Sequence, residues 1–125
     1  MVAEANGQEI FGQDIKTLFE PHPKNKLNDN IINFYLAMIQ ERSKQENHRS
    51  VFAFNHRFFT KLKKNGWEKV KRWSKNIELF SIDLILIPIC WDFEGEGHWC
   101  LAAIDMEEKE ILYFDSCGKH DRVSF

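Results

Sequence analysis

Cysteine, proline and glycine are all scarce in this chain, and neither sign of charge is in large excess. The three cysteines are an odd number, and no hydrophobic leader follows Met1, so the chain fits a reduced, intracellular compartment rather than a disulfide framework. No apolar run is long enough to span a bilayer. With a formal net charge of -2, the chain has no global attraction to nucleic acid or to acidic lipid.

What the chain does have is ample material for a hydrophobic core. Of its 125 residues, 43% are hydrophobic and 14% aromatic, and phenylalanine alone occurs 11 times. That length suits one domain with a real core. Internal repeats and low-complexity stretches are lacking, so one compact unit is the default expectation.

Residues 1–25 are polar and contain Pro21 and Pro23, which prevent a continuous helix. We expect an N-terminal arm here, with one short element around Ile15 to Phe19. The rest of the chain, residues 26–125, is expected to form the domain proper.

The firmest helical pattern covers residues 28–43. Asn28 suits the N-cap, and Asp29 in the first turn is favoured by the helix dipole. Apolar side chains then recur at helical spacing: Ile31, Phe34, Tyr35, Met38 and Ile39. The spacing therefore predicts one helix over this segment.

Short elements are predicted after this helix. Residues 51–54 resemble an extended piece, and 57–64 and 67–73 resemble two short helices, basic on one side, with Asn65-Gly66 as a left-handed stop between them.

Strands are predicted in the second half of the chain. The apolar run 82–89 predicts a strand buried on both faces, and Pro88 places its end near a sheet edge. Apolar segments at 101–104 and 111–114 complete a three-stranded antiparallel meander. Helices first and strands afterwards favour an α+β domain. Residues 118–125 begin a polar segment without completing an element, so the domain looks cut short.

The last two apolar segments place a histidine and an aspartate at the same end of a hairpin. Pairing His98 with Asp115 implies that Ile104 faces Lys109 around the four-residue loop 105–108. Opposed residues share a face with Cβ atoms roughly 5 Å apart, so the Asp115 carboxylate is expected to accept the Nδ1 proton of His98. A histidine held in this way can act as the base that activates a serine or cysteine nucleophile.

No residue is an obvious nucleophile for this pair. Cys100 shares the face of His98 but points into the cover of the sheet, where a small core residue is expected. Cys117 reaches the imidazole only if the turn after Asp115 curls back.

Two other functions compete for these residues. A histidine and an aspartate on adjacent strands are, without a motif, more often a structural hydrogen-bonded pair than a catalytic one. His98, Cys100, Asp115 and Cys117 are also potential zinc ligands, but no Cys-x-x-Cys or paired-histidine spacing indicates a structural site, so we expect neither a metal nor another cofactor.

A basic cluster on the two short helices is a candidate nucleic-acid surface, because phosphate contacts come mainly from such side chains. It comprises Lys61, Lys63, Lys64, Lys69, Lys71, Arg72 and Lys75. An acidic protein partner explains the cluster equally well, and nucleic acid is disfavoured by the net charge.

Six sequence blocks, in order, are similar to a known family of enzymes. They are Leu27-Asn28-Asp29-Asn30-Ile31-Ile32-Asn33-Phe34-Tyr35, Phe58-Phe59-Thr60-Lys61-Leu62, Val70-Lys71-Arg72-Trp73, Leu86-Ile87-Pro88-Ile89, His98-Trp99-Cys100-Leu101 and Tyr113-Phe114-Asp115-Ser116. In this order they resemble the Ulp/SENP family of SUMO-specific cysteine proteases. The resemblance implies a papain-like α+β fold, here incomplete, and enzymes that hydrolyse the bond after the terminal diglycine of SUMO, both in the precursor and in conjugates.

The resemblance also implies roles for individual residues. His98 matches the general base and Asp115 the carboxylate that orients it, while Trp99 matches one wall of the tunnel over the diglycine. Asp29 matches an acid that pairs with an arginine of SUMO. Three further residues fall where the family's SUMO-facing surface lies: Phe54, Arg72 and Trp73. A nuclear or nuclear-envelope location is implied in the same way.

Two departures from the family pattern affect the expected activity. Lys26 stands where the family has the tryptophan of the opposite tunnel wall. The nucleophilic cysteine and an oxyanion-hole glutamine belong to a Gln…Asp-Cys-Gly segment beyond the Asp-Ser strand, and the chain stops before it. This chain alone is therefore expected to be inactive. The alternative is a non-catalytic SUMO-binding module or decoy.

Overall fold

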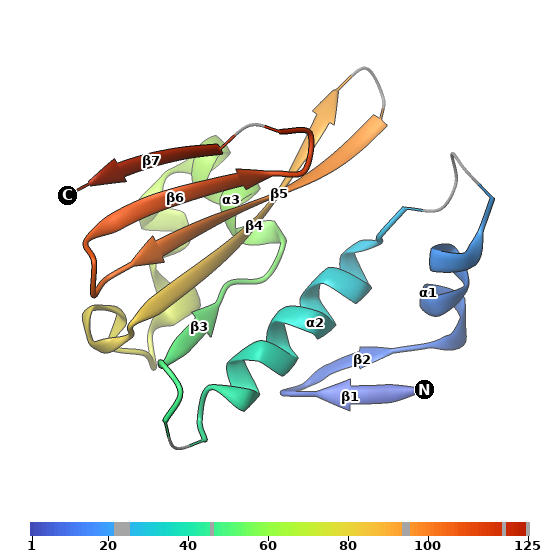
Figure 1. Ribbon diagram of the computed structural model, residues 1–125, viewed down its shortest axis with the longest axis horizontal. Helices are drawn as coiled ribbons and strands as arrows, with labels where there is room; N and C mark the ends of the chain where they lie inside the picture. Colours follow the sequence, from blue (N-terminus) through green and yellow to red (C-terminus); the bar gives the residue numbers. More distant parts are fainter. Residues whose placement is uncertain (22–25, 46, 94–95, 119, 125) are drawn as a thin grey trace. The chain divides into compact units, whose positions relative to one another are not determined.

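The structure is a computed structural model that describes residues 1–21, 26–45, 47–93, 96–118 and 120–124; for 92, 93, 96 and 120 only the backbone is described. Part of the expected arm, including Pro23, lies outside the described residues. The chain divides into two compact units, Met1–His48 and Arg49–Phe125 (Figure 1). Within the described ranges, no helix combines the length and the apolar character that a membrane crossing requires.

The first unit opens with a β-hairpin that the sequence did not lead us to expect. Strand β1 (Ala3–Ala5) pairs antiparallel with β2 (Gln8–Ile10) around Asn6 and Gly7, whose φ angles are +47° and +83°. Positive φ at both central residues is the geometry that an Asn-Gly pair favours in a two-residue hairpin loop. The prediction of a single short element before residue 25 was therefore wrong.

The short element itself is present where it was expected. Helix α1 (Gly12–Lys16) continues into a 3₁₀ turn, η1 (Thr17–Phe19). Asp14, which is buried, accepts hydrogen bonds from the backbone N–H of Phe11 and from the side chains of Asn28 and Asn30. These contacts tie α1 to the start of the next helix, and they hold the pKa of Asp14 below its usual value, with the Phe11 N–H as the largest cause.

The predicted long helix is confirmed as α2 (Asp29–Arg42). Its N-cap is Asn28, whose Oδ1 accepts a hydrogen bond from the Ile31 N–H at 2.9 Å. The buried residues of α2 are Asn33, Leu36 and Ala37, and the helix packs on β1 and β2. Tyr35 and Met38, which belong to the apolar pattern, are exposed in this structure.

The second unit is built on a five-stranded mixed sheet with the order β3-β4-β5-β6-β7 (Figure 1). Its strands are β3 (Val51–Ala53), β4 (Leu84–Phe93), β5 (Glu96–Asp105), β6 (Glu110–Asp115) and β7 (His120–Ser124). β3 runs parallel to β4, and the other neighbours pair antiparallel. The expectation that residues 118–125 complete no element was wrong, because this polar segment forms β7, an edge strand paired with β6.

The connection between β3 and β4 consists of short helical segments. Helix α3 (Arg57–Asn65) confirms the helix predicted at 57–64. The helix predicted at 67–73 is instead two 3₁₀ turns, η2 (Trp67–Lys69) and η3 (Lys71–Ser74), and η4 (Leu79–Ser81) follows. Gly66, with φ of +82°, ends α3 and separates it from these turns.

Strand β4 is longer than predicted and does not end at Pro88. The Leu86 carbonyl accepts a hydrogen bond from the Phe54 N–H, so the backbone polar groups of Leu86 point toward β3. Residues two apart in a strand direct these groups to the same side, so the nitrogen of Pro88 also points toward β3. β3 pairs with β4 only as far as Leu86, and the missing N–H of Pro88 therefore breaks no ladder bond. On its other side, β4 stays paired with β5 from Leu84 to Phe93.

The core of this unit lies between the sheet and the helical connection. Its buried members are Phe54, Phe58, Val70 and Ile85, with Phe54 stacked on Phe58 at a ring-centroid distance of 3.7 Å. Val70 has no exposed surface at all. The packing of this layer fixes α3 and η3 against one face of the sheet.

We predict that Val70→Ala lowers the free energy of unfolding by about 2 kcal/mol, because it removes two methyl groups from a closed site and leaves a cavity. Val123→Ala is the matched control, since Val123 is 57% exposed on β7, and it is expected to change stability by less than about 0.5 kcal/mol. Urea denaturation measures both. Equal losses for the two variants would contradict this assignment of the core.

Candidate active site

The β5–β6 register differs by two residues from the one predicted. Cys100, not His98, lies opposite Asp115, and Ile104 lies opposite Ile111. Asp105 remains in the strand, so the loop is 106–109 and begins one residue later than expected. The Asp105 Oδ1 holds this start of the turn in place, because it accepts hydrogen bonds from the Arg49 guanidinium at 2.7 Å and from the Glu108 N–H at 3.0 Å.

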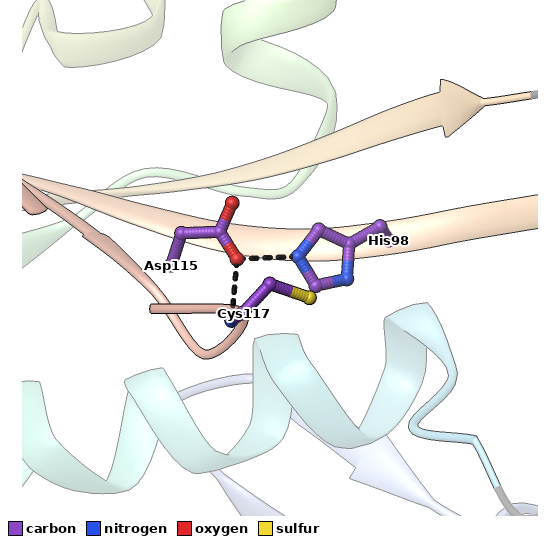
Figure 2. A group of neighbouring side chains, drawn as sticks. All are labelled: His98, Asp115 and Cys117. Carbon is purple, nitrogen blue, oxygen red and sulfur yellow. Dashed lines mark hydrogen bonds and ion pairs between the residues drawn. The ribbon is translucent and has the colours of Figure 1, made fainter. Parts of the chain in front are cut away.

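A shift of two residues leaves every side chain on its predicted face, so His98 and Asp115 still meet. They are diagonal neighbours across β5 and β6, a separation that long side chains span. The His98 Nε2 and the Asp115 Oδ1 lie 2.6 Å apart (Figure 2). The predicted bond to Nδ1 was wrong, because from the diagonal position the carboxylate meets the far end of the ring. A proton on Nε2 leaves the Nδ1 lone pair available to accept another.

The Asp115 carboxylate is fixed from a second direction by the turn that follows it. Its Oδ1 also accepts the Cys117 N–H at 2.9 Å, and the Gly118 N–H bonds to the Asp115 carbonyl at 3.0 Å. The Cys117 N–H is the largest of the causes that lower the pKa of Asp115 to about 2, and the hydrogen bond from His98 is the next. The group is therefore an anion throughout the neutral range.

Cys100 and Tyr113 are neighbours of Asp115 in the sheet. Cys100 lies directly opposite Asp115 in the β5–β6 register, and the Tyr113 hydroxyl accepts a hydrogen bond from the Trp91 Nε1–H at 3.0 Å. Burial is the main cause that raises the pKa of the Cys100 thiol. Cys100 is thus a buried, protonated group opposite Asp115, in agreement with the small core residue expected at this position.

Trp91 is itself held from the side of α3. The Phe59 ring meets it edge-on at 5.6 Å, and the Lys63 ammonium lies 4.7 Å from the centroid of its ring. Lys71 forms an ion pair with Glu68. Two members of the basic cluster therefore have partners within the chain.

The turn after Asp115 does curl back, which was the condition set for Cys117 to approach the imidazole. A ligating atom from each of His98, Asp115 and Cys117 lies within 4.8 Å of the others (Figure 2). Aspartate at the first position of a β-turn and glycine at the fourth favour this conformation. The Asp115-Ser116-Cys117-Gly118 run is therefore the sequence signal that predicts this turn, and with it the approach of Cys117 to His98.

The other expected site residues occupy both units. Trp99 is half-buried on β5, and its ring meets that of His56 edge-on at 6.3 Å. Arg72 is exposed, and Trp73, 39% exposed, packs on Phe58. Phe54 is only 5% exposed and belongs to the core.

Asp29 lies in the first unit, at the first residue of α2, where it accepts the Asn30 N–H.

In catalytic triads, an ionised carboxylate orients the histidine that acts as base, and the contact between His98 and Asp115 has this arrangement. Such a pair serves hydrolases that use an activated serine or cysteine.

Residues 25–124 match the family described as the Ulp1 protease family, C-terminal catalytic domain. The chain therefore belongs to the Ulp1 protease family. The resemblance drawn from the six sequence blocks is confirmed.

Individual relatives agree with this membership. Sentrin-specific protease 2 of Mus musculus is 41% identical over 106 residues, which are 85% of this chain and 17% of that protein. A solved structure of the SUMO protease Ulp1 with its catalytic cysteine oxidised to a sulfenic acid is 34% identical with a TM-score of 0.71, covering 91% of this chain and 48% of that one. The Ulp1 protease domain in complex with Smt3, the yeast orthologue of SUMO, has a TM-score of 0.65 at 34% identity, over 86% of this chain and 45% of that one.

These matches confirm the expected α+β, papain-like class. The chain spans about a sixth of the length of the curated relative and just under half of the length of the solved protease domains.

We predict that Asp115→Asn removes a pH-dependent part of the stability. The folded-state pKa of about 2 lies below the ordinary value of 3.8, so the carboxylate contributes stability above pH 4 and loses it as the pH falls toward 2. The difference in unfolding free energy between the wild type and Asp115→Asn should therefore narrow from pH 5 to pH 2.5 in urea denaturation.

Cys117→Ala is the control for this measurement, because it keeps the backbone N–H that bonds to Asp115. Its pH dependence should follow that of the wild type. A constant difference in unfolding free energy between the wild type and Asp115→Asn across this range would contradict an ionised carboxylate that accepts two hydrogen bonds.

Proposed function

We propose that this chain forms the first part of the catalytic domain of a SUMO-specific cysteine peptidase, which matures the SUMO precursor and removes SUMO from its conjugates. The observation that carries the proposal is the 2.6 Å contact between His98 Nε2 and Asp115 Oδ1, inside a segment that matches the Ulp1 protease family.

In the proposed reaction, His98 is the base and Asp115 orients it. With its proton on Nε2 held by Asp115, the imidazole uses Nδ1 to remove the proton of a cysteine thiol. The thiolate attacks the carbonyl carbon of the terminal glycine of SUMO, and the imidazolium returns the proton to the leaving amine. Water then hydrolyses the thioester and regenerates the thiol. By family resemblance, this thiol belongs to a Gln…Asp-Cys-Gly segment beyond the Asp115-Ser116 strand.

SUMO recognition is proposed to use the residues that the family resemblance assigns to substrate binding. Trp99 would cover the terminal diglycine, where only residues without side chains fit beside the ring. Asp29 would pair with an arginine of SUMO, and the exposed Arg72 and Trp73 would contact its surface. Phe54 would contribute by supporting Trp73 through Phe58, because Phe54 itself is buried.

The proposed substrate also implies a location. SUMO and its conjugates are found inside the cell, and the family resemblance extends this to the nucleus or the nuclear envelope. The odd number of cysteines is compatible with a reducing compartment.

We predict that the chain binds SUMO with a Kd below about 100 μM, and that Asp29→Asn and Arg72→Ala each weaken binding by about tenfold, because each removes one charged contact. Isothermal titration measures the affinities. Lys64→Ala, which removes an exposed charge from the end of α3, should leave the Kd unchanged. Equal weakening by all three variants would indicate nonspecific attraction, and no binding by the wild type would contradict the proposed partner.

The proposed reaction is tested in a longer chain that includes the thiol, with substitutions at His98 and Asp115. Cleavage of a SUMO precursor is expected to fall by about 100-fold or more in His98→Ala and Asp115→Asn, with little change in KM, because the pair acts on the chemical step. Cys90→Ala, at an exposed cysteine outside the site, is the control. SUMO binding without cleavage in the wild type would favour the non-catalytic binding module instead.

A SUMO probe with a C-terminal electrophile distinguishes the thiols. The proposal predicts no labelling of Cys100 or Cys117 in the 125-residue chain. Labelling of either would contradict the assignment of the nucleophile to a later segment.

A further inference from the structure

Three side chains with different metal-binding atoms meet at the end of β5 and β6. His98 offers an imidazole nitrogen, Asp115 a carboxylate oxygen and Cys117 a thiol sulfur, and these atoms all lie within 4.8 Å of one another. Figure 2 shows the Cys117 side chain extending toward the imidazole ring. The proposed peptidase reaction uses His98 and Asp115 but assigns no role to the Cys117 sulfur.

This combination of ligands suits a particular class of metal ion. Imidazole nitrogen, thiolate sulfur and carboxylate oxygen are the three donors that zinc uses in proteins, whereas calcium and magnesium prefer oxygen alone. Zinc bonds of about 2.0–2.3 Å place neighbouring ligand atoms about 3.3–3.8 Å apart in a tetrahedral site. The His98 Nε2 and the Asp115 Oδ1, now 2.6 Å apart, must therefore separate by about 0.7 Å to admit the ion, and the sulfur must approach by up to about 1 Å, which rotation of the exposed Cys117 side chain can supply.

We propose that His98, Asp115 and Cys117 bind one zinc ion, with three protein ligands and one open position. The turn is the basis of this arrangement, because the bond from the Cys117 N–H to Asp115 brings the sulfur back over the dyad. Cys117 is exposed, so the metal reaches the site from solvent without any rearrangement of the sheet. On binding, the thiol releases its proton to water. The metal binds Nε2 in place of the proton shared with Asp115, and that proton moves to Nδ1 by exchange with solvent.

The proposed site overlaps the dyad, and this has a consequence that rests on the proposed function. A histidine that binds zinc cannot also accept a proton from a nucleophile, so zinc would be a reversible inhibitor of the peptidase. Metal binding and peptidase activity are measured separately, and either can fail without the other.

Cobalt(II) is the probe for the test, because it occupies zinc sites and its thiolate complexes absorb in the near ultraviolet. The purified, reduced, metal-free chain is titrated with cobalt chloride and then with zinc chloride in the presence of a chromophoric chelator. We expect a sulfur-to-cobalt charge-transfer band that saturates at one equivalent and is lost when zinc displaces the cobalt.

Variants assign the ligands. Cys117→Ala should abolish the charge-transfer band and weaken zinc binding by about 100-fold, and His98→Ala and Asp115→Asn should each weaken it by about tenfold or more. Cys90→Ala is the matched control, since Cys90 is also an exposed thiol but lies outside the cluster, and it should bind like the wild type. Circular dichroism checks that each variant is folded.

Three results would overturn the proposal: no saturable band in the wild type, an unchanged band in Cys117→Ala, or loss of the band in Cys90→Ala alone.

Discussion

The position of the Asp115 carboxylate is the constraint on which the rest of the site depends. Its Oδ1 receives the Cys117 N–H from the turn and the His98 Nε2 from the neighbouring strand, and Cys100 lies opposite it in the sheet. Each of these contacts is set by backbone structure: the β-turn by Asp115 and Gly118, the strand contacts by the β5–β6 register. The imidazole is thus oriented by the sheet itself, and the helical layer contributes by packing Phe59 against Trp91, whose indole bonds to Tyr113 on β6.

Much of the fold could be predicted from short-range patterns in the sequence. The N-cap of α2 and the apolar run of β4 are encoded locally, and both were predicted correctly in kind. The register of the β5–β6 hairpin was not, because the contact of Asp105 with Arg49 joins residues that are far apart in sequence. β7 was missed for a related reason, since a polar edge strand has no apolar alternation of its own and is recognised only by its pairing with β6.

The candidate site was predicted better than the register that was used to derive it. A two-residue error preserves the face of every side chain in a strand, so the meeting of His98 and Asp115 survived, whereas the ring nitrogen involved did not. The approach of Cys117 depended on the curl of one turn, which spacing alone leaves undetermined. The same turn thus has two effects. It lowers the pKa of the Asp115 carboxylate, which the proposed peptidase site requires, and it brings the Cys117 thiol to His98, which the proposed zinc site requires.

The tautomer of His98 tests the central claim most directly. Long-range ¹H–¹⁵N correlation spectra of the metal-free chain at neutral pH distinguish a ring that carries its proton on Nε2 from one that carries it on Nδ1. The hydrogen bond to Asp115 predicts the Nε2–H tautomer in the wild type and a loss of this preference in Asp115→Asn. A proton on Nδ1 in the wild type, or the same spectrum in both proteins, would contradict the account.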